Sequence, residues 1–221
     1  MLYSHDYKCI FIHIPKCAGT SIEECLELNF VLEAENLTYL KIEKRWHCSK
    51  TQTIQKLGKK TWESYFKFSF VRNPWDRIIS AWRMFETKSW CKLDQSYSLS
   101  EFIDFVTNEK IDYHANYLTM WQKESWQHSL ENVRHHTLPA THPFYGLVED
   151  EKLTVDFCGR FENLQSDFAK VTEKLGVEII LPHRLKTDRN PNYQEYFKDS
   201  GLIEIIRDYY RKDCELFEYD F

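Results

Sequence analysis

Two junctions between a short apolar run and a helical pattern constrain this chain more than any other feature. In the first, Cys9–Ile12 leads into Pro15–Lys16 and then into Gly19–Ser21; in the second, Phe66–Phe70 leads into Arg72–Pro74. A short apolar run that ends in a turn and continues as an amphipathic helix is typical of a strand–loop–helix unit. Helix N-termini present unpaired N–H groups and bind anions. Two such junctions predict a site for a ligand that carries two phosphate groups.

The composition is that of one globular domain. The chain has 221 residues, of which 43% are hydrophobic and 29% charged, and we expect a single domain over residues 1–221. The net charge of -5 argues against broad nucleic-acid binding, which requires a positive field. The basic stretch from Lys41 to Lys60 is either a solvated face or a rim that attracts an anionic ligand.

The cysteines and the N-terminal residues indicate in which cellular compartment we expect the protein. The seven cysteines contain no C-x-x-C pair, so neither a zinc knuckle nor a disulfide framework is indicated. No signal peptide is evident, and no stretch approaches the roughly 20 apolar residues of a membrane span. We expect a soluble, reduced, cytoplasmic protein without a membrane partner, although the sequence leaves open whether a leader or anchor has been removed.

Periodicity and capping signals predict mostly parallel strands flanked by helices, an α/β fold. Thr20 with Glu23, and Ser98 with Glu101, fit capping boxes, and Asn73 fits an N-cap. Strands are expected at 7–14, 37–42, 65–71 and 154–158. Helices are expected at 21–29, after Cys48, from Asn73 to 86, and at 99–107, 113–122, 164–175 and 200–216, with irregular structure at 123–146 and a loop at 182–192.

The first junction offers a lysine loop that suits a phosphate group. Lys16 is a mobile positive charge, Gly19 allows a close backbone approach, and Thr20 and Ser21 add hydroxyl donors. The loop differs from the nucleoside-triphosphatase pattern G-x-x-x-x-G-K-[ST], because the lysine precedes the glycine and no first glycine exists. This difference favours another phosphate donor over ATP.

The second junction offers Arg72 at the end of a strand and Ser80 two turns into the next helix. An arginine can fork onto a phosphate, and ligands of open α/β sheets bind outside the carboxyl ends of strands. Taken singly, Arg72 could instead pair with Asp76, and Ser80 could be an ordinary polar helix position. Together with the lysine loop, they favour a shared anion site.

These two motifs resemble the cofactor motifs of sulfotransferases, in particular the branch with carbohydrate and heparan-type enzymes and bacterial relatives. The similarity continues through Val155–Leu164 and Asp213–Phe221. It implies a P-loop fold akin to nucleotide kinases and 3′-phosphoadenosine 5′-phosphosulfate (PAPS) as the donor. The 5′-phosphosulfate would be bound by Lys16, Cys17, Ala18, Gly19, Thr20 and Ser21. The 3′-phosphate would be bound by Arg72 and Ser80, and by Lys186 or Arg189 from a late loop.

The resemblance also implies in-line sulfuryl transfer to a hydroxyl without a metal ion. Lys16 would stabilise the leaving phosphate oxygen, and the product would be 3′-phosphoadenosine 5′-phosphate (PAP). We choose His47 as the general base for the acceptor hydroxyl; the alternative is a surface histidine beside Trp46. His13, within a buried strand, is expected to be a core residue. Cys17, near a helix N-terminus, is expected to be a small filler of the loop and not a reactive thiol.

Two other functions are also compatible with the sequence. One is a nucleotide-dependent phosphotransferase on the same scaffold, which the altered lysine loop disfavours. The other is a non-catalytic nucleotide-binding module, which Lys16 and His47 disfavour. We expect a carbohydrate or a small hydroxyl-bearing metabolite as acceptor; the sequence does not identify it, nor does it define the oligomeric state.

Overall fold

The structure is a computed structural model that describes residues 1–30, 32–33, 44–45, 49–88, 91, 93, 95–108, 130–181 and 189–221. The described chain falls into two compact units. The first unit comprises residues 1–72 with 140–185, and the second comprises 73–139 with 186–221. The single domain over 1–221 stays a prediction.

The first unit is built around a five-stranded sheet with the order β3-β1-β2-β6-β9. The strands are β1 Leu2–Ser4, β2 Cys9–Ile12, β3 Asn29–Phe30, β6 Phe66–Val71 and β9 Phe157–Arg160. The three strands β2, β6 and β9 run parallel, while β1 pairs antiparallel with both β2 and β3. Every residue of β2 is buried, which explains why its sequence is an unbroken apolar run.

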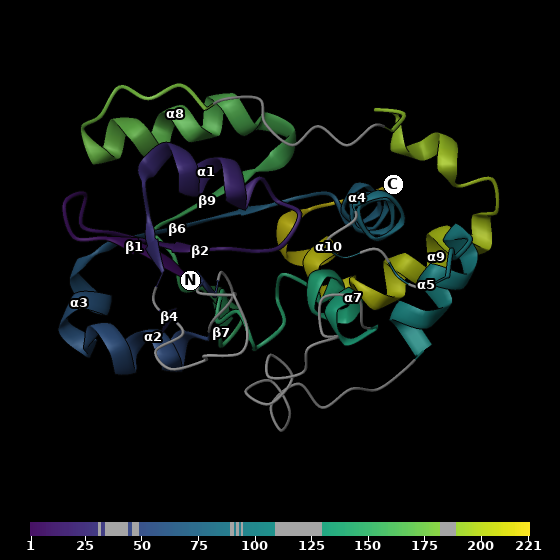
Figure 1. Ribbon diagram of the computed structural model, residues 1–221, viewed down its shortest axis with the longest axis horizontal. Coiled ribbons are helices and arrows are strands. Elements are labelled where there is room, and N and C mark those ends of the chain that lie inside the picture. Colours follow the sequence, from purple (N-terminus) through teal and green to yellow (C-terminus); the bar gives the residue numbers. More distant parts are fainter. Residues whose placement is uncertain are drawn as a thin grey trace. The chain divides into compact units, whose positions relative to one another are not determined.

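Helices cover both faces of this sheet. Figure 1 shows α1 and α8 on one side and α2 and α3 on the other. Their bounds are α1 Gly19–Leu26, α2 Lys50–Leu57, α3 Lys59–Ser64 and α8 Leu164–Leu175, which follows the 3-10 turn η2 Phe161–Asn163. The unit also contains two small two-stranded antiparallel sheets, β4 Leu32–Glu33 with β5 Lys44–Arg45 and β7 Val148–Glu149 with β8 Lys152–Leu153. The predicted α/β class with a mostly parallel sheet flanked by helices is confirmed.

The second unit is helical where it is described. Its elements are α4 Pro74–Thr87, α5 Leu99–Asn108, α7 Leu130–Thr137, η3 Tyr193–Tyr196, α9 Ser200–Tyr209 and α10 Arg211–Phe217. Helix α4 packs against α5, α7, α9 and η3. Trp75, Ile79, Phe85 and Tyr210 are among the fully buried side chains of its core.

Several predicted elements and caps are confirmed. Helix α8 spans the predicted 164–175 and ends at Gly176, whose positive φ of 72° suits a glycine. The predicted capping box of Ser98 with Glu101 is present, and a further box of Ser49 with Gln52 begins α2. The strand expected at 37–42 and the helix expected at 113–122 lie outside the described residues.

Other predictions need correction. Thr20 is not an N-cap, because α1 begins at Gly19 after Ala18. The segment predicted as irregular contains α7, and the predicted final helix is broken at Tyr210 into α9 and α10. The strand expected at 154–158 is β9 at 157–160. The pairing of β9 with β6 begins only at Phe157, which lies opposite Phe68. At the preceding position, the Asp156 side chain accepts the N–H of Lys67.

Candidate functional site

Three neighbouring parallel strands end at the same edge of the sheet. Strand β2 ends at Ile12, which pairs with Ser69 of β6, and the last residue of β6, Val71, pairs with Arg160 at the end of β9. The carboxyl ends of parallel strands are where ligands bind in open α/β sheets. The lysine loop, Arg72 and Phe161 follow these three ends directly.

The lysine loop, residues 13–18, has an unusual backbone. Lys16 and Ala18 both adopt positive φ angles, 68° and 65°, which non-glycine residues rarely do. Ala18 occupies the N-cap position of α1 and forms no side-chain cap hydrogen bond. Because an alanine side chain cannot accept a hydrogen bond, the first-turn N–H groups are left for another acceptor. An anion is the acceptor that the helix dipole favours there.

Two side chains of the loop itself, those of His13 and Cys17, pack against the neighbouring backbone. A Cβ added at Gly19 would lie 1.9 Å from Nε2 of His13, so only a glycine fits while the ring keeps its place. His13 is buried as expected, and its ring stacks on Phe11 with the centroids 5.7 Å apart. Cys17 is 1% exposed, and its Sγ donates to the carbonyl of Pro15, as expected of a loop filler.

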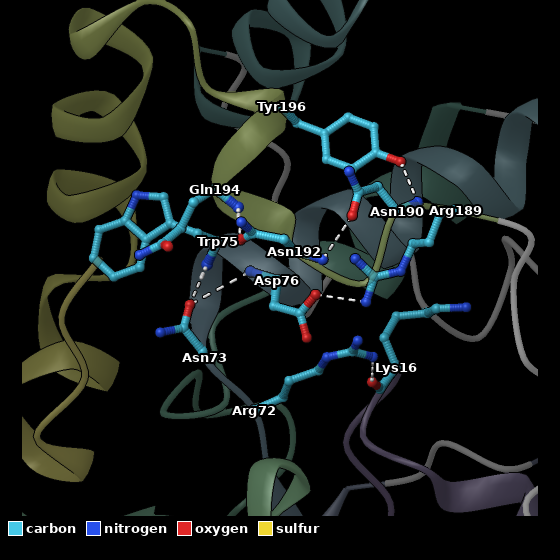
Figure 2. A network of polar contacts seen from close by, with 10 residues as sticks. All are labelled: Lys16, Arg72, Asn73, Trp75, Asp76, Arg189, Asn190, Asn192, Gln194 and Tyr196. Atoms are coloured by element: carbon cyan, nitrogen blue, oxygen red, sulfur yellow. Dashed lines mark hydrogen bonds and ion pairs between the residues drawn. The ribbon is translucent and has the colours of Figure 1, made fainter.

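Arg72 contacts the lysine loop directly. One of its terminal N–H groups donates to the backbone carbonyl of Lys16 at 3.0 Å, as Figure 2 shows. Its guanidinium carbon lies 3.7 Å from the centroid of the Phe161 ring. The arginine is 7% exposed, so the charge lies largely out of water and close to these two partners. Lys16 itself is half-buried. The two cations give this end of the sheet a positive potential that suits an anionic ligand.

The turn from β9 to α8 is fixed by Asp167. One carboxylate oxygen accepts the backbone N–H of Arg160 at 2.8 Å, and the other accepts from the Lys170 ammonium at 2.7 Å. Burial opposes the charge of this carboxylate, but these hydrogen bonds outweigh burial and lower the pKa of Asp167 below its ordinary value. The same turn carries Phe161.

The second junction begins α4 in the way the sequence predicts. The side-chain oxygen of Asn73 accepts from the N–H groups of Trp75 and Asp76, and Pro74 occupies the first turn. The amide of Asn73 also donates to the carbonyl of Asp220 at 2.9 Å. Ser80 is buried on the same helix.

An ion pair joins α4 to the late loop within the second unit. Arg189 donates to Asp76 at 2.5 Å, and the two side chains are only 9% and 13% exposed (Figure 2). The loop is tied further by Asn190, whose N–H donates to the hydroxyl of Tyr196. Arg189 is therefore held in place by a carboxylate of the second motif.

The predicted site residues fall into three groups. The first unit contains Arg72, which meets the Lys16 backbone, together with the loop residues Lys16, Cys17 and Ala18 and the α1 residues Gly19, Thr20 and Ser21. Ser80 and Arg189 lie in the second unit. His47 and Lys186 lie outside the described residues.

Sequence reasoning missed Phe161 and Asp167. Both follow the third parallel strand, and the Phe161 segment is part of the third stretch of family resemblance. That position was the available signal, but no spacing rule indicated that this ring would lie on Arg72.

Two features are absent from the described part of the chain. No helix there is both long enough and apolar enough to cross a membrane. Among the same residues, no group of three or more His, Cys, Asp or Glu side chains is arranged to hold a metal ion.

Comparisons with known proteins extend these observations. The sequence model of the sulfotransferase family matches residues 1–220. An uncharacterized protein of Archaeoglobus fulgidus is 29% identical over 140 residues, which are 63% of this chain and 92% of that protein. Carbohydrate sulfotransferase 14 of Danio rerio is 26% identical over 129 residues, 54% of this chain and 33% of the fish protein. This chain thus matches only about a third of the fish protein's length.

Proposed function

This chain belongs to the sulfotransferase family, and we propose that it moves a sulfuryl group from PAPS to an acceptor hydroxyl. The observation that carries the proposal is the lysine loop of the first unit. There the N-terminus of α1 has no side-chain cap, and Lys16 and Arg72 supply positive charge at the end of parallel strands. This set of donors fits a phosphosulfate group, which is anionic and needs N–H donors on several oxygens.

The proposed donor contacts follow the family resemblance. The 5′-phosphosulfate is bound by Lys16, the first-turn N–H groups of α1 and the hydroxyls of Thr20 and Ser21, with Cys17, Ala18 and Gly19 shaping the loop. The 3′-phosphate is bound by Arg72 and Ser80. Of the two late-loop candidates, Lys186 and Arg189, the buried ion pair with Asp76 supports Arg189, because that pair orders its guanidinium.

The bound donor supplies an activated sulfuryl group. Lys16 donates to the phosphate oxygen on which charge develops as the sulfur–oxygen bond breaks. Removal of such a preorganised donor typically raises the barrier by about 3–4 kcal/mol. His47 accepts the proton of the attacking hydroxyl, a task for which a neutral imidazole is suited near pH 7.

The acceptor is proposed only as a class. A hydroxyl of a carbohydrate or of a small metabolite fits the family, and the name of the fish relative supports a carbohydrate. The cytoplasmic location expected from the sequence belongs to the proposal as well.

Calorimetric titration with PAP tests the donor site. We expect micromolar binding by the wild type and much weaker binding by Arg72→Ala, because a buried guanidinium that meets a phosphate is lost. Lys16→Ala should bind PAP more weakly and lose about a hundred- to a thousandfold in turnover of PAPS. Lys174→Ala removes an exposed lysine of α8 and should behave as the wild type.

Two results would contradict the proposal. Absence of PAP binding by the folded wild type would contradict the proposed donor site. Binding of PAP without turnover of PAPS with any acceptor of a panel would instead indicate a non-catalytic nucleotide-binding module. The same turnover assay with and without magnesium separates a kinase from a sulfotransferase, since kinases require the metal to bridge the phosphates.

A further inference from the structure

We propose that Phe161 is a positioning residue of the donor loop: its ring fixes the guanidinium of Arg72, which in turn fixes the backbone of Lys16. The significance of the loop for catalysis rests on the proposed function, whereas the chain of contacts is independent of it. None of the donor contacts proposed above involves Phe161. It acts through Arg72.

The first contact lies between Phe161 and Arg72. The guanidinium carbon is 3.7 Å from the ring centroid, which places the cation directly over the face of the ring. The negative face of an aromatic ring attracts a cation, and the attraction grows when water is excluded. Because Arg72 is largely buried, the ring and the charge interact in such a setting. A flat ring also restricts the plane in which the guanidinium can lie.

The second contact lies between Arg72 and the loop. A guanidinium N–H donates to the carbonyl of Lys16 at 3.0 Å. Lys16 and Ala18 have positive φ angles, a conformation that costs free energy for residues with a Cβ. Such a conformation persists only where the surroundings hold it. The charged hydrogen bond from Arg72 is one of the contacts that hold it, and it acts on the residue whose side chain is proposed to reach the leaving group.

Phe161 is itself held by rigid elements. It follows β9 immediately and begins the turn η2 that leads into α8. The N–H of the preceding residue, Arg160, is bound by the Asp167 carboxylate at 2.8 Å. The ring is therefore set by a strand end and a helix start, while the loop that it supports follows a different strand. Rigid elements that support a functional site position its residues more precisely than a loop does without such support.

The aromatic ring at position 161, and not only its apolar volume, should be needed to hold the Arg72 guanidinium. Phe161→Leu keeps apolar volume but removes the face that binds the cation, whereas Phe161→Tyr keeps the face. Phe157→Leu is the matched control: Phe157 is the first residue of β9, the strand that Phe161 follows, and the Lys170 ammonium lies 6.0 Å from the centroid of its ring.

Amide hydrogen exchange of the ligand-free full chain tests the contacts directly. We expect exchange of the loop that includes Lys16 and Ala18 to rise about tenfold in Phe161→Leu. Phe161→Tyr and the control Phe157→Leu should match the wild type in that loop. An unchanged loop in Phe161→Leu, or a Phe161→Tyr variant as perturbed as Phe161→Leu, would overturn the inference.

A double-mutant cycle then tests the route to function. Phe161→Leu should lower kcat about tenfold in the wild-type background but much less in the Lys16→Ala background, since both changes act on one group. Equal effects in the two backgrounds would overturn the positioning role. If wild type bound no PAP and turned over no PAPS while loop exchange still responded, the proposed function would fail and the contact chain would stand.

Discussion

At the scale of single residues, the close approach of the His13 ring to Gly19 determines which side chain can stand at the start of α1. The imidazole occupies the position that a Cβ at residue 19 would need. Protein interiors are close-packed, so such an overlap must be relieved by a shift of the ring or of the backbone. The glycine in this motif is thus required by a core side chain, in addition to any need of the ligand.

We predict that Gly19→Ala destabilises the chain by about 1–3 kcal/mol, because the new methyl group overlaps the His13 ring. Urea unfolding followed by fluorescence measures this change. The double variant Gly19→Ala/His13→Ala frees the space and should recover part of the loss. If the double variant lost the full sum of the two single effects, the overlap would not be the cause.

At the scale of elements, the start of α4 depends on one side chain that makes two kinds of contact. The oxygen of Asn73 caps the helix, and its amide holds the carbonyl of Asp220. The cap could be predicted from the sequence because it involves residues two and three positions away. The contact with Asp220 could not, because 147 residues separate the partners.

We predict that Asn73→Ala lowers the free energy of unfolding by about 1–2 kcal/mol, the usual effect of losing an N-cap. Asn73→Asp keeps an acceptor and places a negative charge at the N-terminus of the helix, so its loss should be smaller. Chemical denaturation of both variants provides the comparison. Equal losses would mean that the amide contact with Asp220 is the important one.

The helix that sequence reasoning missed shows the limit of periodicity. Helix α7 contains Asn132, Arg134 and His135, which are polar and yet buried. An amphipathic pattern is read from apolar residues on one face, so a helix that buries polar side chains leaves no such pattern. The final helix shows a second limit, since its break at Tyr210 coincides with a fully buried ring whose hydroxyl donates to the carbonyl of Thr137.

At the scale of the whole molecule, Asp167 links global stability to acid pH. Burial disfavours its charge, but the N–H of Arg160 and the ammonium of Lys170 lower its pKa in the folded chain. A carboxylate with a lower pKa in the folded state stabilises that state above the unfolded pKa of about 3.8. This contribution is lost as the pH falls through the folded pKa.

We therefore predict that the unfolding free energy of the wild type falls more steeply below about pH 4 than that of Asp167→Asn. At neutral pH the variant should be the less stable of the two. Urea titrations from pH 3 to about 7 measure both slopes. Glu173→Gln, an exposed change on the same helix, serves as the control and should keep the wild-type slope. Parallel slopes for wild type and Asp167→Asn would contradict the assignment.

By itself the sequence determined what depends on near neighbours. The two strand-to-helix junctions, the Asn73 cap, the Ser98 box and the end of α8 at Gly176 each involve residues a few positions apart. Local hydrogen bonds and backbone preferences are sufficient for such features. The candidate residues Lys16, Arg72 and Ser80 were found in the same way, from their places after a strand or within the following helix.

Only the tertiary structure decided what depends on which strands lie side by side. The order β2-β6-β9 brings Phe161 onto Arg72 and Arg72 onto the backbone of Lys16, partners far apart in the sequence. The tertiary structure also places Ala18, with a positive φ, at the N-cap of α1, whereas the sequence had predicted an ordinary N-cap at Thr20. Local rules favour the cap, but contacts from neighbouring strand ends hold a strained loop that no local rule would choose.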